Sequence, residues 1–191
     1  MKIAIIGDGN VGSALRRGFA RGGHDAKAVG NEPDRLHEFA SSADVVVLAV
    51  PFGAIDNVVH ELGNSVDGKI LVDVTNALNE DYGLAVGFTT SGAEELQKKM
   101  PRAKVVKAFN TVFASNMDRG QVKGEKLTVL VAGDDQQAKR AVLELATSIG
   151  FDAVDAGPLM NARLLEPMAL QTIALGYAQG MGTDIGFRLV H

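Results

Sequence analysis

Three glycines near the start of the chain have the spacing of a phosphate-binding turn. Gly7, Gly9 and Gly12 follow the apolar run at residues 3–6 and precede a helical pattern that extends to about Arg21. In this context the first glycine permits a tight turn, the second lets the backbone approach a pyrophosphate, and the third lets the helix pack on the strand. The helix N-terminus then presents free N–H groups and a positive dipole to the phosphates. The pattern predicts a dinucleotide site.

The residues after the second strand decide which dinucleotide fits. A carboxylate there hydrogen-bonds the ribose hydroxyls and selects NAD, whereas an arginine nearby accommodates the 2′-phosphate of NADP. This stretch contains Asn31, Glu32 and Arg35. Glu32 would repel a 2′-phosphate if it points inward, and Arg35 could attract one. Alternatively, Glu32 is a solvated charge at a helix start, favoured by the helix dipole. The residues alone leave both NADP(H) and NAD(H) open.

Side chains for a metal centre or an acid–base pair are scattered or missing. The chain has no cysteine, which excludes disulfides, thiol catalysis and cysteine-ligated metal. Its four histidines, at positions 24, 37, 60 and 191, fall in a turn, in predicted surface helices and at the terminus. None has the spacing of a metal site or of a nucleophile–base set. We therefore expect no bound metal and no certain catalytic acid or base.

Strand-like and helix-like segments alternate along the chain. The run at residues 44–50, which Pro51 ends, has the continuous hydrophobicity of a parallel strand buried on both faces. The predicted strands are residues 3–6, 26–30, 44–50, 69–74, 104–108, 127–132, 151–154 and 186–190. After the first helix, the predicted helices are residues 33–41, 53–62, 92–100, 135–149 and 161–179, with a loop at 77–91. This alternation predicts an α/β fold of the Rossmann type, a doubly wound, mostly parallel sheet with a short C-terminal helix and tail.

The length of 191 residues suits a single NAD(P)-binding domain, residues 1–191, in which residues 157–191 form a C-terminal helical and tail extension. Ligands of doubly wound sheets bind at the carboxyl ends of the strands. That rule selects residues 7–11, 30–32, 50–52, 75–76 and 109–111, which we expect to line one crevice.

Composition narrows the range of partners. Apolar residues make up 46% of the chain, enough for a sizeable core. The formal net charge is −4 and no long basic run exists, so we expect no nucleic-acid partner. No apolar run approaches the roughly 18 residues of a membrane span, and the apolar stretch after Met1 is too short for a signal peptide. We therefore expect a cytoplasmic protein without a membrane segment.

The segments after the glycine turn resemble a known family. In order, they are Leu48–Phe52, Asp73–Asn76, Val105–Thr111, Asp155–Arg163 and Gly180–Gly186. Together they are similar to the NADPH-dependent reductases of the deazaflavin coenzyme F420, over nearly the whole chain. Val105–Thr111 is also similar to the cytoplasmic reductase domain of the six-transmembrane ferric reductases. The chain departs from the deazaflavin reductases at Asn31-Glu32, where they typically have Ser or Thr followed by Arg.

The resemblance implies an NADP(H)-dependent oxidoreductase that transfers a hydride between the nicotinamide and a deazaflavin (coenzyme F420) or flavin-like acceptor. It implies that NADP(H) is preferred, with NAD(H) as the other option, and that the protein is a homodimer. The cofactor-binding residues that it implies at the pyrophosphate and adenosine are Gly7, Asp8, Gly9, Asn10, Val11, Asn31 and Glu32, to which the sequence adds Arg35. Those implied around the nicotinamide are Val50, Pro51, Phe52, Thr75, Asn76, Ala108, Phe109, Asn110 and Thr111.

Asn110 is the side chain that we expect nearest the reacting ring. It follows a buried strand, where its amide can position the nicotinamide carboxamide or cap the following helix. Phe52 and Phe109 either wall the ring or belong to the core, and Asn76 either contacts the cofactor or ends a strand in a turn. Hydride transfer needs no dedicated acid or base, since the chemistry belongs to the cofactors. The alternatives are a non-catalytic NAD(P) sensor and a reductase of an unidentified small substrate.

Overall fold

Seven strands form one central sheet in the computed structural model, which describes residues 1–30, 32–79, 81 and 83–190. Its strands are β1 (Lys2–Ile6), β2 (Asp25–Val29), β3 (Val45–Leu48), β4 (Ile70–Asp73), β5 (Lys104–Lys107), β8 (Thr128–Gly133) and β9 (Asp152–Asp155). They lie in the order β2-β1-β3-β4-β5-β8-β9. Every neighbouring pair is parallel except β5 and β8, which are antiparallel. The predicted Rossmann-type, mostly parallel sheet is confirmed.

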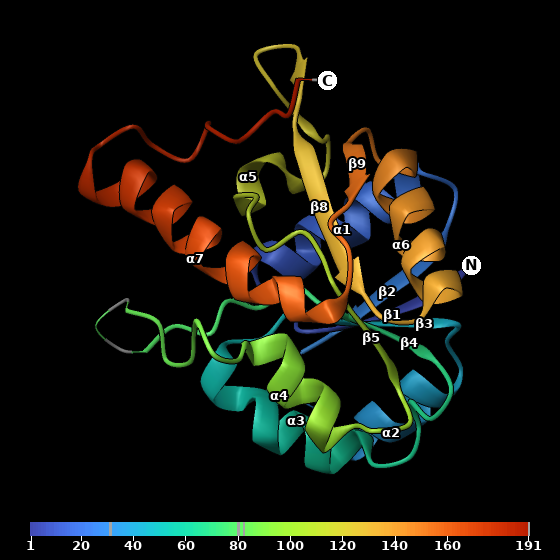
Figure 1. Ribbon diagram of the computed structural model, residues 1–191. Coiled ribbons are helices and arrows are strands. Elements are labelled where there is room, and N and C mark those ends of the chain that lie inside the picture. Colours follow the sequence, from blue (N-terminus) through green and yellow to red (C-terminus); the bar gives the residue numbers. More distant parts are fainter. Residues whose placement is uncertain (31, 80, 82, 191) are drawn as a thin grey trace.

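Helices cover both faces of this sheet (Figure 1). They are α1 (Asn10–Arg21), α2 (Pro33–Ser41), α3 (Ile55–Leu62), α4 (Gly92–Lys99), α5 (Ala114–Met117), α6 (Gln136–Ser148) and α7 (Ala162–Ile173). Successive strand residues point to opposite faces. Ile3 and Ile5 of β1 therefore pack with α1 and α6 in one apolar cluster, whereas Ala4 and Ile6 pack with α2, α3 and α4 in the other. The two clusters together form the core.

Burial of the central strands and capping of the neighbouring helices hold the strand ends in place. All four residues of β3 are buried, as expected of a parallel strand that is covered on both faces. The neighbouring helices have their own start signals. Ser91 caps α4 by accepting a hydrogen bond from the amide of Glu94, and Asp135 caps α6 in the same way. Because β1, β3, β4 and β5 are parallel neighbours, their carboxyl ends meet at one edge of the sheet.

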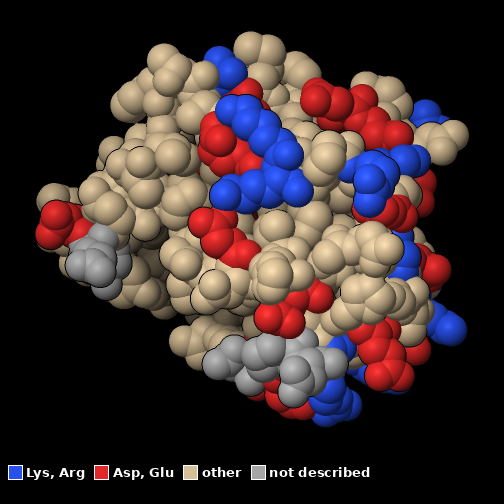
Figure 2. Space-filling model, turned by 90° about the horizontal axis from the view of Figure 1, so that it is seen from below, with Lys and Arg blue, Asp and Glu red and all other residues tan. Residues whose placement is uncertain are grey.

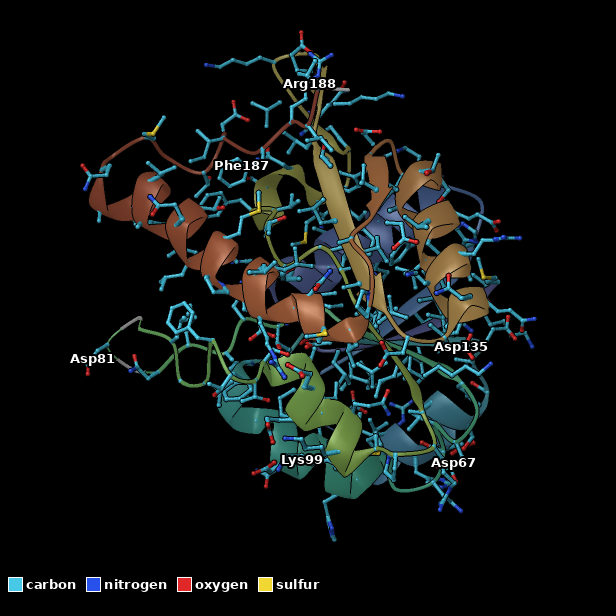
Figure 3. All side chains as sticks on the ribbon, viewed as in Figure 1. Asp67, Asp81, Lys99, Asp135, Phe187 and Arg188 are labelled. Atoms are coloured by element: carbon cyan, nitrogen blue, oxygen red, sulfur yellow. The ribbon has the colours of Figure 1, made fainter. Side chains whose placement is uncertain are left out.

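The predicted C-terminal helix is present, in three sections. A 3-10 turn (Leu159–Asn161) leads into α7, and a π-helical turn (Ala174–Ala178) follows it. The strand predicted at residues 186–190 is wrong. The tail instead runs beside the first residue of β8, where the amide of Thr128 donates to Phe187 O and the amide of Leu189 donates to Thr128 Oγ1, both at 2.9 Å (Figure 3). Because a side-chain hydroxyl replaces the second backbone partner, no regular ladder forms.

Two short elements were not predicted from the sequence. One is α5, and the other is a hairpin of β6 (Gln121–Val122) and β7 (Glu125–Lys126). Strands of two residues are too short to show an alternating pattern. Arg188 of the tail forms an ion pair with Glu125 of this hairpin (Figure 3 labels Arg188).

The surface is mixed in charge. Figure 2 shows one face on which basic and acidic side chains are interspersed among uncharged ones. Across residues 1–30, 32–79, 81 and 83–190, no helix is long and apolar enough to cross a membrane.

Candidate dinucleotide and hydride-transfer site

The glycine turn joins β1 to α1, and its three glycines have different neighbours. Gly7 has φ +108°, and a Cβ atom there would overlap the carbonyl oxygen of Ala49. A Cβ at Gly12 would overlap the carbonyl oxygen of Gly7, so the strand and the helix can approach only because that position has no side chain. At Gly9, by contrast, a Cβ would meet no atom within 4 Å.

Open space at Gly9 is what a bound pyrophosphate requires. Gly9 is the N-cap residue of α1, so the free amides of the first helical turn begin there. Asp8 and Asn10 beside it are exposed, and Val11 is half-buried. Protein packing demands glycine at Gly7 and Gly12 but not at Gly9, where the missing side chain leaves open space for a ligand. The turn therefore fits the phosphates of a dinucleotide.

The residues predicted to hold the adenosine lie at the carboxyl end of β2. A Cβ at Gly30 would lie 2.8 Å from Asp8 Oδ1, so the Asp8 carboxylate sits against the end of that strand. Arg35 Nη1 lies 2.6 Å from Glu32 Oε2 in an exposed ion pair. Arg35 is thus already paired with the carboxylate that would oppose a 2′-phosphate. The third predicted residue here, Asn31, lies outside the described residues.

A groove of about 360 Å³ runs along the outer edge of β2, next to this ion pair. Arg16 of α1, Lys27 of β2 and Arg35 of α2 line it, together with Glu32 and Phe39. Three cations and one carboxylate give this groove a net positive charge, which favours an anionic ligand group.

Two asparagines join the ends of β4 and β5. Asn76 Nδ2 donates to the backbone oxygen of Asn110 at 3.0 Å, and Asn110 Nδ2 donates to Asn76 Oδ1 at 3.1 Å. Asn110 Nδ2 also donates to the carbonyl of Leu165 in α7 at 2.9 Å. Asn110 does not cap α5, because the N-cap position of that helix is Phe113. Within the described part of the chain, no donor reaches Asn110 Oδ1.

The aromatic residues divide between the two alternatives. Phe109 is 1% exposed and packs edge-to-face on Phe19 and Phe151, with ring centroids 6.0 and 5.9 Å apart. It belongs to the core, and its φ of +64° is the left-handed conformation that bulky residues rarely adopt. The ring-wall alternative for Phe109 is therefore wrong. Phe52 is half-buried and lies near the start of α4, close to Gly92.

The remaining predicted positions differ in how accessible they are. Pro51 is exposed and Val50 is half-buried, so both can face a ligand at the end of β3. Thr75, Ala108 and Thr111 are buried. Their side chains support the strand ends, and any contact they make with a ring has to come through the backbone.

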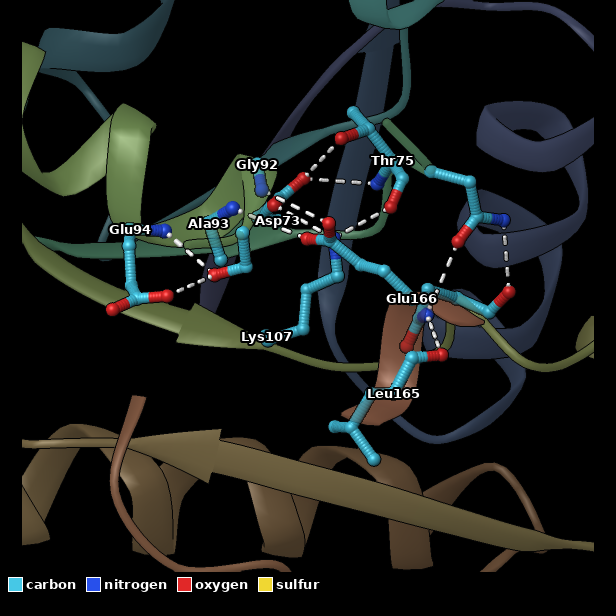
Figure 4. A network of polar contacts seen from close by, with 11 residues as sticks. Asp73, Thr75, Gly92, Ala93, Glu94, Lys107, Leu165 and Glu166 are labelled. Carbon is cyan, nitrogen blue, oxygen red and sulfur yellow. Dashed lines mark hydrogen bonds and ion pairs between the residues drawn. The ribbon is translucent and has the colours of Figure 1, made fainter. Parts of the chain in front are cut away.

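A buried ionic cluster beneath these strand ends was not predicted from the sequence. Asp73 ends β4, Lys107 ends β5, the two are paired in the sheet register, and Glu166 comes from α7. The three side chains are between 0% and 1% exposed. Lys107 Nζ lies 2.9 Å from Asp73 Oδ2, 2.8 Å from Glu166 Oε1 and 2.6 Å from the carbonyl oxygen of Thr75 (Figure 4). All three N–H groups of the ammonium are thus used.

Both carboxylates have further donors. Asp73 Oδ1 accepts from the amide and hydroxyl of Thr75, and Glu166 accepts from the amides of Gly92 and Ala93 at the start of α4. Burial alone would lower the pKa of Lys107, but the adjacent carboxylates of Asp73 and Glu166 raise it above its ordinary value. The cluster carries one excess negative charge, which the N-terminus of α4 stabilises.

A second ion pair, nearer the surface, joins α7 to α4. Arg163 of α7 donates from Nε and Nη2 to the two carboxylate oxygens of Glu94 in α4, at 2.9 and 2.7 Å. The hydrogen bond from Arg163 is the main reason why the pKa of Glu94 lies below its ordinary value.

The far half of α7 is apolar. Leu170, Ile173, Ala174, Tyr177 and Ala178 line a mostly apolar groove of about 690 Å³ along that helix and the π-helical turn. Among the described residues, no group of three or more His, Asp or Glu side chains is arranged to hold a metal ion.

Comparison with known proteins agrees with this geometry. The model of the family "NADP oxidoreductase coenzyme F420-dependent" matches residues 2–77. The F420-dependent NADP reductase of Methanothermobacter thermautotrophicus is 31% identical, over 87% of this chain and 85% of that protein. Rat metalloreductase STEAP3 is 30% identical over 90% of this chain, which spans only 37% of that protein. A crystal structure of an F420-dependent NADP reductase candidate from Arthrobacter sp. FB24 superimposes over both full chains with TM-score 0.91 and 30% identity.

Proposed function

This chain belongs to the family of F420-dependent NADP reductases, and from that premise we propose that it transfers a hydride between NADP(H) and a deazaflavin or flavin-like acceptor. One observation carries the proposal. The open cradle at Gly9 and the bonded pair Asn76–Asn110 lie at the carboxyl ends of strands in the same sheet, where an extended dinucleotide reaches both.

The chain's own residues bind and orient. Gly9 and the first amides of α1 hold the pyrophosphate, and the residues after β2 hold the adenosine ribose. Asn110 Oδ1, whose amide nitrogen is fixed by Asn76 and Leu165, accepts a hydrogen bond from the carboxamide of the nicotinamide. When bound, the nicotinamide supplies or accepts the hydride. The protein aligns the ring and keeps water away from it.

NADP(H) is the proposed preference, with NAD(H) as a weaker ligand. The relatives named F420-dependent NADP reductase support a preference for NADP(H). The positively charged groove beside β2 supports it too, because Arg16 and Lys27 can bind a 2′-phosphate there. Glu32 works against it by holding Arg35. Discrimination between the two dinucleotides is therefore expected to be modest.

The apolar groove along α7 and its π-helical turn is proposed to contribute to the acceptor site, because a deazaflavin or flavin ring is flat and largely apolar. A homodimer, in which this exposed face is covered by a second copy, is proposed with it. A flavin is the second acceptor to be tested, because its ring system is also flat and largely apolar.

Stopped-flow mixing of the protein and NADPH with coenzyme F420, FMN or FAD in turn tests the function. We expect oxidation of NADPH in step with reduction of one acceptor, and slower transfer from NADPH that carries deuterium at the transferred C4 position. Tight NADP(H) binding by calorimetry without transfer to any of the three would overturn the proposal in favour of a sensor. Transfer only to an imine or another small substrate would do so in favour of a different reductase. Analytical ultracentrifugation tests the dimer.

A further inference from the structure

Glu166 is a buried carboxylate that joins three separate parts of the fold. It belongs to α7, its Oε1 lies 2.8 Å from Lys107 Nζ at the end of β5, and its two oxygens accept from the amides of Gly92 and Ala93 at the start of α4 (Figure 4). It is therefore both the counter-charge of an ammonium and the cap of a helix.

Leu165, the residue before Glu166, connects α7 to the ends of β4 and β5. The carbonyl of Leu165 accepts from Asn110 Nδ2 at 2.9 Å, and the same nitrogen donates to Asn76 Oδ1. Leu165 and Glu166 are consecutive in one helical turn. The position of the Glu166 carboxylate thus determines where the Leu165 carbonyl meets the Asn110 amide.

The other asparagine is connected to the same ammonium. Lys107 Nζ donates to the carbonyl of Thr75 at 2.6 Å, and Thr75 directly precedes Asn76. The pair Asn76–Asn110 is therefore tied to the ionic cluster from both sides, through Thr75 on the strand side and through Leu165 on the helix side. Glu166 itself is 1% exposed, so it acts on any bound ring only through these neighbours.

We propose that Glu166 is a positioning residue: seated on Lys107 and the first amides of α4, it fixes α7 and orients the Asn110 amide at the nicotinamide end of the crevice. Its effect on catalysis rests on the function proposed above. The orientation of Asn110, however, is a property of the protein without ligands and can be measured alone.

Two variants separate positioning from simple attachment of α7. Glu166→Gln keeps the size of the side chain and part of its hydrogen bonding but removes the charge that holds Lys107. Arg163→Gln is the matched control, because it breaks the other polar link between α7 and α4, to Glu94, which has no hydrogen bond to Asn110 or Lys107. Thermal unfolding and calorimetric NADP⁺ binding confirm that each variant is folded.

The first readout is the Asn110 side-chain amide in asparagine-labelled ¹⁵N NMR spectra of the free protein, assigned with Asn110→Gln. We expect these signals to shift and their hydrogen exchange to accelerate in Glu166→Gln but not in Arg163→Gln. The second readout is kinetic. In Glu166→Gln we expect kcat to fall about tenfold or more while the Kd for NADP⁺ changes less than twofold.

Unchanged Asn110 signals in Glu166→Gln would overturn the inference, whatever its activity. Shifted signals in a protein whose wild type reduces no acceptor would support positioning and contradict only the hydride-transfer proposal. If Glu166→Gln does not fold, Glu166→Asp takes its place with the same readouts, since it keeps the charge but withdraws the carboxylate by one methylene. Wild-type signals in that variant would also overturn the inference.

Discussion

The two ends of the proposed dinucleotide site, one for the pyrophosphate and one for the nicotinamide, are built in different ways. At the pyrophosphate end, β1, the glycine turn and α1 come from the first 21 residues, and the parts that must touch are close in sequence. At the nicotinamide end, the partners are 34 residues apart for Lys107 and Asp73, 55 for Asn110 and Leu165, and 74 for Gly92 and Glu166. The first end depends on backbone space, and the second depends on a balance of buried charge.

This difference predicts which substitutions each end tolerates. The glycine turn has no room for a methyl group at two positions but carries no buried charge. The ionic cluster has room for side chains of similar size but not for an unpaired carboxylate. Substitutions that fill space in the glycine turn and substitutions that remove charge from the ionic cluster should therefore differ in how much they lower protein stability and NADP⁺ affinity.

Lys107→Met is expected to have the largest effect. It would leave the buried carboxylates of Asp73 and Glu166 without their ammonium, and breaking a buried pair in this way typically costs about 3–5 kcal/mol. Urea unfolding near neutral pH measures the free energy. A loss below about 1 kcal/mol would mean that the nicotinamide end does not depend on charge balance.

Substitutions in the glycine turn should have the next largest effect. They separate effects on protein stability from effects on ligand binding. Gly12→Ala is expected to lower the free energy of unfolding by about 1–3 kcal/mol, because its methyl group overlaps the carbonyl of Gly7. Gly9→Ala should cost less than about 1 kcal/mol, yet weaken NADP⁺ binding about tenfold or more by calorimetry. Equal losses of stability in the two variants would contradict the distinct roles assigned to them.

Glu32→Gln should have a smaller effect, confined to the adenosine end. Freed from Glu32, Arg35 can meet a 2′-phosphate, and a hydrogen bond to a charged group contributes about 1.5–3 kcal/mol at most. We expect the affinity ratio of NADP⁺ to NAD⁺ to rise several-fold in side-by-side calorimetry, because the change removes a carboxylate that opposes the 2′-phosphate and favours the ribose hydroxyls of NAD⁺. A ratio that stays constant would show that Glu32 and Arg35 lie outside the ribose site.

The smallest effect is expected from Arg163→Gln, and it depends on pH. Arg163 lowers the pKa of Glu94 below its ordinary value of 4.5, so this pair stabilises the folded protein above that pH. The contribution is lost as the pH falls through the lower folded-state pKa. The difference in Tm between wild type and variant should therefore shrink on acidification. A difference that grows would reverse the assigned sign.

Residues near in sequence could be predicted, and contacts across the fold largely could not. The glycine turn and the strand ends follow from local patterns. Asn76 and Asn110 were expected to line one crevice, which stays a prediction, and the two side chains do hydrogen-bond to each other. Lys107 did carry a signal, since a lysine inside a buried strand needs a counter-charge. Nothing local marks Glu166 as its partner, because α7 is placed by packing rather than by any motif.

The same reasoning explains the errors at the C-terminus and at Phe109. A run of apolar residues after a glycine-rich stretch looks like a strand, but residues 186–190 find only one backbone partner before the Thr128 hydroxyl replaces the next. An aromatic residue at a strand end faces either the ligand or the core, and the left-handed backbone at Phe109 turns its ring inward. A left-handed backbone conformation at a bulky residue cannot be predicted from the residue type.

The order in which a ribosome delivers the chain gives Glu166 a further significance. Residues 1–30, with the glycine turn, emerge well before α7 and can assemble from neighbouring segments. Lys107 emerges long before Glu166, and until α7 arrives its third N–H and the first amides of α4 have only water as partners. The centre of the sheet can therefore be sealed from water only after α7 has been made. A chain that stops between α4 and α7 would leave the Lys107 ammonium and the first amides of α4 open to water.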